Sequence, residues 1–263
     1  GGILLVNILC AVIFVYFFYN FINTLPRPWL SLVIAIPYFI IVISMGFVRQ
    51  GLAIAIFMYA ITFIEKKNYK SYIFFTLLAS TFHLSALAFI PVILLQFLYK
   101  KIFSAFFIFI FVTIIFYINY DFILAKSADY FLSGMTSDGA FIRSLMNLLP
   151  ALIFILFMKK FRIQKNEKLF WFQLSIIAII FSILLIFYPN FTIIDRLGYY
   201  LISLQIFVFT FLPGVFGIYS KKNKVWVILI IFYYFLVLLV WQNFASHNYA
   251  WIPYKSYFFN LNW

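Results

Sequence analysis

The sequence predicts an all-α integral membrane protein, because of its composition, its apolar run lengths and the spacing of its basic residues. Of the 263 residues, 67% are hydrophobic and 10% are charged, against roughly 25% charged in ordinary soluble domains. The long apolar runs lack the polar alternation of a transmembrane barrel. We therefore predict about eight transmembrane helices in a single polytopic domain, residues 1–263.

Several other classes are excluded by the same composition. A single cysteine, Cys10, rules out a disulfide framework and a thiolate metal cluster. The formal charge of +13 comes in short clusters between apolar runs, which favours membrane topology over nucleic-acid binding. Phosphate-binding loops, nucleophile elbows and dinucleotide fingerprints are absent from the sequence. We expect no metal and no cofactor.

The basic clusters fix the expected direction of each span, because the positive-inside rule places such clusters in the cytoplasm. The clusters are Lys66, Lys67 and Lys70; Lys100 and Lys101; Lys159, Lys160, Arg162, Lys165 and Lys168; and Lys221, Lys222 and Lys224. The expected spans are 3–22, 29–47, 50–64, 102–120, 142–158, 169–188, 197–219 and 225–241. Both ends of the chain and an extracytoplasmic loop at 121–141 then lie outside.

Two membrane arrangements are compatible with the sequence of residues 71–98. Basic clusters flank this segment on both sides, yet it is too short for two helices of about 20 residues each. A re-entrant hairpin from the cytoplasm, turning near Thr81–Ser85 with Pro91 in its return limb, satisfies both observations. A single kinked, tilted span is the alternative.

Arginine, unlike lysine, marks the outer edges of the predicted spans. Arg49, Arg143 and Arg196 each lie at or just before the start of a helix that runs inward, where free backbone N–H groups and the helix dipole attract anions. A guanidinium suits bidentate phosphate recognition. Three such helix starts would form a phosphate or pyrophosphate site at the outer leaflet. The alternative is that these arginines extend to lipid headgroups.

The candidate acids and bases share this outer face. Asp195 directly precedes Arg196 at the mouth of a span, where it is either a general base or a helix N-cap. His83 is a titratable group within an apolar stretch, and such residues in membranes indicate function. Its alternative role is structural, with the ring bonded to a backbone carbonyl.

Three segments together carry a family resemblance. They are 26–29 (PRPW), 45–55 (MGFVRQGLAIA) and 79–86 (ASTFHLSA). They resemble the EpsG family of bacterial polysaccharide polymerases, in which an Arg-Gln-x-x-Ala helix precedes a Phe-His-x-Ser-Ala segment. Arg196 with Tyr199 and Tyr200 is similar to a later Arg-aromatic element of that family.

The resemblance implies a Wzy-like glycosyltransferase with a GT-C-like helical architecture in the bacterial cytoplasmic membrane. Its substrate would be oligosaccharide repeat units on undecaprenyl pyrophosphate, joined into O-antigen or capsule at the periplasmic or outer face. Membrane lipid and a chain-length regulator are the other implied partners. Family members usually carry an N-terminal Gly-x-Asp-x-x-Tyr-like element. It is missing here, so we expect the chain to be part of a longer protein.

The helix-start arginines and the family resemblance together indicate the same site. Arg49, Gln50, Arg143 and Arg196 would bind the pyrophosphate, and Asp195 or His83 would deprotonate the acceptor sugar hydroxyl. Ser85 and Tyr199 would contribute sugar or other hydrogen-bond contacts. Two rival functions are a flippase of the same lipid-linked sugars and a membrane O-acyltransferase with His83 as base. The flippase is disfavoured by the lack of a visible internal repeat.

Overall fold

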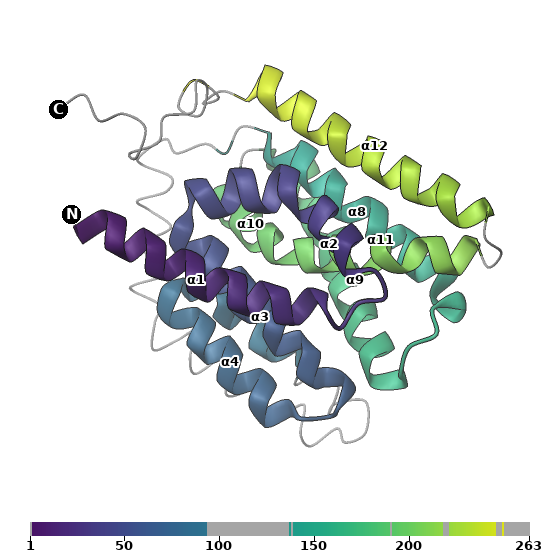
Figure 1. The fold of residues 1–263 in the computed structure, drawn as a ribbon, viewed down its shortest axis with the longest axis horizontal. Coiled ribbons are helices and arrows are strands. Elements are labelled where there is room, and N and C mark those ends of the chain that lie inside the picture. Colours follow the sequence, from purple (N-terminus) through teal and green to yellow (C-terminus); the bar gives the residue numbers. More distant parts are fainter. Residues whose placement is uncertain are drawn as a thin grey trace.

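A computed structural model describes residues 2–93, 137, 139–189, 191–217, 221–245 and 249. In these residues the chain forms helices and no strand (Figure 1). This confirms the predicted all-α class, and the apolar lengths confirm a membrane protein. The elements are α1 (Gly2–Ile22), α2 (Pro28–Ala35), the π-helix η1 (Ile36–Ser44), α3 (Val48–Glu65), α4 (Tyr69–Phe82), the 3₁₀-helix η2 (Leu84–Phe89), α8 (Ala140–Phe157), η3 (Met158–Lys160), α9 (Lys165–Phe187), α10 (Thr192–Gly198), η4 (Tyr199–Leu201), α11 (Ile202–Phe216) and α12 (Lys221–Phe244).

Six helical segments in the described part are long and apolar enough to cross a bilayer. They are Gly2–Ile22, Val48–Glu65, Ala140–Lys160, Lys165–Phe187, Thr192–Phe216 and Asn223–Phe244. The expected span at 29–47 corresponds to the shorter apolar helix Pro28–Ser44. The expected span at 102–120 lies outside the described residues, as does most of the loop at 121–141.

The helices differ in how much protein surrounds them. In their most apolar stretches, 67% of the residues are buried in α3 and 83% in the α10–α11 segment, against 6% in α1 and 11% in α12. Figure 1 shows α12 along one edge of the bundle and α1 along another side. The apolar surface of α1 and α12 is therefore available to lipid, whereas α3 and α11 form the core.

The chain reverses direction at His83, which has an extended backbone between α4 and η2. The Tyr72 hydroxyl, near the start of α4, donates to the Phe89 carbonyl oxygen at 2.8 Å. Seventeen residues of continuous helix would separate these positions by about 25 Å. The geometry is therefore that of a hairpin turning within the predicted Thr81–Ser85 stretch, and a single kinked helix does not fit it.

The turn between η1 and α3 places the start of α3 tightly against the end of η1. A Cβ atom on Gly51 would lie 2.6 Å from the Ser44 Cα atom, closer than packed atoms allow. Glycine at this position permits the contact. Within η1 the Ser44 hydroxyl donates to the Phe39 carbonyl five residues earlier, at 2.8 Å. Such π-helical turns are frequent at functional sites, and this one leads directly to Arg49.

Candidate functional site

Arg196 is held in place by the start of α3. Its guanidinium Nη1 donates to Gln50 Oε1 at 3.2 Å, and Gln50 Nε2 donates back to the Arg196 carbonyl oxygen at 3.0 Å. The guanidinium also lies 4.0 Å from the centre of the Phe47 ring. The cation–π contact and the bond from Nη1 fix the charged group, and the bond to the carbonyl oxygen fixes the backbone of Arg196. Gln50 is buried and both ends of its amide group bond to Arg196, so it supports Arg196.

Arg49 lies beside this pair but is exposed. Within the described part of the chain its guanidinium makes no hydrogen bond or ion pair with protein. Its five N–H donors are therefore available to a ligand. An exposed, unpaired guanidinium next to a fixed one is a suitable arrangement for an anion with two phosphate groups.

His83 is the third member of this group. It lies outside the six candidate spans, at the junction of α4 and η2. Burial lowers the pKa of His83, and the neighbouring charges of Arg196 and Arg49 lower the pKa further. The imidazole is therefore neutral near pH 7 and able to accept a proton.

A chain of hydrogen bonds runs from His83 into the core. His83 Nδ1 lies 2.5 Å from Ser85 Oγ, and Ser85 Oγ donates to the Tyr200 hydroxyl oxygen at 3.2 Å. Tyr200 is fully buried, and its ring stacks on the Phe89 ring with centroids 4.9 Å apart. Residues from the hairpin and from η4 thus meet at this point.

Arg143 and Asp195 form a second, neighbouring group. Arg143 Nε donates to Asp195 Oδ1 at 2.8 Å and Nη2 to Oδ2 at 2.9 Å, which is a bidentate ion pair. Ser137 Oγ and the Tyr199 hydroxyl also donate to Oδ2, at 2.6 Å and 3.0 Å. Arg143 Nη2 in turn donates to Ser137 Oγ at 2.8 Å. The Asp195 side chain is only 2% exposed.

The structure thus brings all the predicted site residues to one end of the bundle, where they form two separate groups. Arg49, Gln50, His83, Ser85 and Arg196 form one group, which we call the arginine–histidine site. Its members come from the start of α3, the hairpin and α10. Arg143, Asp195 and Tyr199 form the other group, which we call the ion-pair cluster. The Tyr199 ring, 5.7 Å from the Arg196 guanidinium, links the two.

The comparisons with known proteins decide the family. The sequence model of a family described as the EpsG family matches residues 1–256. The chain belongs to the EpsG family. This is a Wzy-like polymerase family, so the predicted resemblance is confirmed, and a polysaccharide polymerase-like membrane protein is the coarse function. No curated protein and no solved structure matches the chain significantly.

In this EpsG-family chain the sequence did not predict two residues that contact the ion-pair cluster. It also gave a third residue, Tyr200, no role. Ser137 binds Asp195 from 58 residues away, and the Tyr38 ring packs edge-on against Tyr199 with centroids 6.4 Å apart. Neither has a sequence signal, since both contacts depend on tertiary packing. Tyr200 was part of the recognised motif without an assigned contact. In contrast, the spacing of four between Asp195 and Tyr199 on a helix indicates contact by itself.

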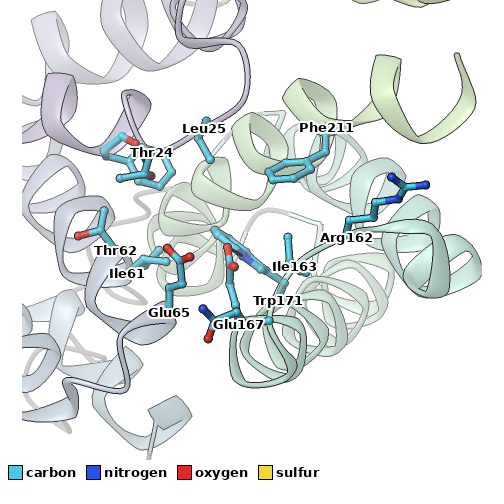
Figure 2. Close-up of a pocket in the computed structure, with 12 residues that line it drawn as sticks. Thr24, Leu25, Ile61, Thr62, Glu65, Arg162, Ile163, Glu167, Trp171 and Phe211 are labelled. Carbon is cyan, nitrogen blue, oxygen red and sulfur yellow. Dashed lines mark hydrogen bonds between the residues drawn. The ribbon is translucent and has the colours of Figure 1, made fainter. Parts of the chain in front are cut away.

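A cavity of about 350 Å³ lies at the other end of the bundle (Figure 2). Thr24, Glu65 and Glu167 line it, together with apolar side chains that include Trp171. In Figure 2 the Glu65 and Glu167 side chains both point into the space. The Trp171 indole N–H donates to Glu167 Oε1 at 3.3 Å. This cavity adjoins the lysine-rich loops and is separate from the arginine–histidine site.

Proposed function

We propose that the chain is a membrane glycosyltransferase that polymerises oligosaccharide repeat units carried on undecaprenyl pyrophosphate, at the extracytoplasmic face of a bacterial cytoplasmic membrane. Its membership of a Wzy-like polymerase family supports the reaction class. The observation that carries the site is the exposed Arg49, which has no partner in the described part of the chain, beside the fixed Arg196 and a neutral His83.

The proposed face follows from the arrangement of charge. Lysine clusters lie between α3 and α4 and between α8 and α9, at one end of the bundle. Arg49 and Arg143 lie in the first turns of α3 and α8, and Arg196 lies in the last turn of the short helix α10, all at the other end. The positive-inside rule makes the lysine end cytoplasmic. The arginine–histidine site is then extracytoplasmic, where a lipid-linked donor would present its pyrophosphate at headgroup level.

In the proposed reaction Arg49 and Arg196 bind the donor's pyrophosphate. The acceptor hydroxyl oxygen bonds to the anomeric carbon of the donor sugar while the bond from that carbon to the phosphate oxygen breaks. The lipid pyrophosphate leaves with the bonding electron pair, and the guanidinium groups stabilise the added charge. His83 takes the proton from the acceptor hydroxyl.

The ion-pair cluster has a different role in this proposal. Both carboxylate oxygens of Asp195 accept hydrogen bonds, and Arg143 is engaged with them. A paired, buried carboxylate is a poor general base, and a paired guanidinium is a poor clamp for a ligand. We therefore assign the base to His83 and the clamp to Arg49 and Arg196. The ion-pair cluster fixes α10 against α8 and thereby positions Arg196.

The test is polymerisation of purified lipid-linked repeat units by the reconstituted protein, read as a ladder of glycan lengths. Arg49→Ala is the sharpest variant because Arg49 has no partner in the described protein whose loss would disturb folding. Loss of one such contact to developing charge costs about 100- to 1000-fold in rate. Arg49→Lys keeps the charge without the planar fork and should fall between Arg49→Ala and wild type.

Arg162→Ala is the matched control, since Arg162 is an exposed arginine at the lysine end. It should leave the glycan ladder unchanged. Full activity in both Arg49→Ala and Arg196→Ala would overturn the proposed pyrophosphate clamp. Glycans of unchanged length that appear on the opposite leaflet would instead identify a flippase.

A further inference from the structure

We propose that a buried chain of three polar side chains positions Arg196 by holding the end of α10. The chain consists of Asn147 on α8, Gln205 on α11 and Tyr234 on α12, and each of them is a positioning residue. The anchoring of α10 is argued from hydrogen bonds alone. Its consequence for catalysis rests on the proposed function, in which Arg196 binds pyrophosphate.

The chain ends on a backbone carbonyl at the end of α10. Asn147 Nδ2 donates to the Gly198 carbonyl oxygen at 3.0 Å. Gln205 Nε2 donates to Asn147 Oδ1 at 2.6 Å, and the Tyr234 hydroxyl donates to Gln205 Oε1 at 2.8 Å. All three side chains are buried. One set of hydrogen bonds thus joins α10 to α8, α11 and α12.

The Gly198 carbonyl fixes the direction of every bond in this chain. A carbonyl oxygen can only accept, so the Asn147 amide presents its nitrogen to Gly198 and its oxygen to Gln205. The Gln205 amide is ordered in the same way, and its oxygen receives the tyrosine proton. Reversing either amide would place two acceptors or two donors together. A buried chain with one satisfied arrangement holds its terminal bond in place.

The end of α10 needs this support because the helix does not continue directly into α11. The N–H four residues beyond Gly198, which would bond its carbonyl in a continuous α-helix, points to the carbonyls of Tyr199 and Tyr200 instead. Asn147 supplies a side-chain donor to Gly198 at this break. Since α10 has seven residues, its own backbone bonds are too few to hold it.

Asn147 and Arg143 together hold α10 at two points. They lie four residues apart on α8, and therefore on one face of that helix. Arg143 binds Asp195. Asn147 binds the Gly198 carbonyl, about one turn further along α10. Arg196 lies between the two points, so an attachment on each side of it fixes both the position and the direction of the helix that carries it.

The direct test is hydrogen exchange of residues 192–201 in the full chain in detergent, read by mass spectrometry. Asn147→Leu keeps a side chain of similar size and removes the bond to Gly198. We expect exchange in this segment to rise by about 10-fold, because a buried acceptor loses its donor. Tyr234→Phe removes only the hydroxyl at the far end of the chain, and should raise exchange in the same segment by a smaller factor. Unchanged exchange there in either variant would overturn the proposal.

Thr210→Val is the matched control for both variants. Thr210 is a buried polar residue of α11, but its hydroxyl donates to carbonyl oxygens of its own helix, those of Ile206 and Phe207. Valine keeps the shape of the side chain, so exchange in 192–201 should stay at the wild-type rate. A rise as large as that in Asn147→Leu would show a general loosening of the bundle and overturn the proposal.

Kinetics test whether the anchor acts through Arg196. A misplacement of about 1 Å can cost about 100-fold in rate, so Asn147→Leu should lower kcat/KM for polymerisation by about 10- to 100-fold. In an Arg196→Ala background the same change should have no further effect, since the group that it positions is already absent. Equal falls in the two backgrounds would show a merely structural effect and overturn the positioning role.

The anchor and the proposed function fail in different ways. Full polymerase activity of Arg196→Ala would refute the pyrophosphate clamp, and exchange in 192–201 would still decide whether the chain anchors α10. Raised exchange with unchanged kcat/KM in Asn147→Leu, where Arg196→Ala is inactive, would leave the clamp in place and overturn the positioning role.

Discussion

The burial of the ion pair between Arg143 and Asp195 predicts how much free energy of unfolding is lost when one partner is removed. Removing one partner of a buried pair costs about 3–5 kcal/mol, because the other charge stays buried without compensation. The Asp195 side chain is 2% exposed and the Arg143 side chain 21%. Arg143→Met should therefore cost the full 3–5 kcal/mol. Asp195→Leu should cost less, about 1–3 kcal/mol, because the freed guanidinium can reach water.

The double variant Arg143→Met with Asp195→Leu should recover most of the loss. Replacing a buried pair by apolar residues of similar volume is often neutral. We expect a double variant within about 2 kcal/mol of wild type, and hence a coupling energy that is strongly favourable for the pair. The hydrogen bonds from Ser137 and Tyr199 lose their acceptor in this variant, which sets the remaining cost.

Thermal unfolding in detergent, followed by fluorescence of the six tryptophans, measures these differences. At about 2–4 °C per kcal/mol for a chain of this size, Arg143→Met should lower Tm by at least about 6 °C. If Arg143→Met had the Tm of wild type but no polymerase activity, the structural role of the ion pair would be refuted. Arg143 would then be a residue that binds the ligand. Destabilisation of the double variant by the sum of the single effects would refute the coupling.

Three further predictions concern the arginine–histidine site and its supports. Gly51→Ala should lower the free energy of unfolding by about 1–3 kcal/mol and reduce activity, since its Cβ would meet the Ser44 backbone at 2.6 Å. Gly198→Ala is the control: the nearest atom to its Cβ would be 3.7 Å away, so Tm should stay unchanged. Tyr72→Phe should weaken the hairpin by about 1 kcal/mol, and hydrogen exchange within 84–93 should then rise; unchanged exchange would contradict the hairpin closure. The polymerisation rate should hold steady as pH falls to 6.5 and decline only below it, because His83 stays neutral above its lowered pKa; a decline that begins above pH 6.5 would contradict this.

The sequence by itself determined that lipid surrounds the protein, that its fold is helical and in which order the helices follow. Apolar runs of nearly 20 residues have one stable form in lipid, so the α1, α3, α9 and α12 segments could be predicted from length and composition. Predicted and described ends agree to within a few residues. The sequence also predicted that arginines mark helix starts, and Arg49 and Arg143 do lie in the first turns of α3 and α8. Arg196 instead lies in the last turn of the short helix α10, which the sequence did not predict as a separate helix.

Only the tertiary structure decided how these residues are used. Arg49 and Arg143 occupy the same kind of helix start, yet Arg49 has no partner among the described residues and Arg143 is joined to Asp195, 52 residues away. The reversal at His83 likewise depends on Tyr72 and Tyr200 meeting the return limb. Such contacts depend on which helix faces pack together, and helix length and hydropathy contain no information about that choice.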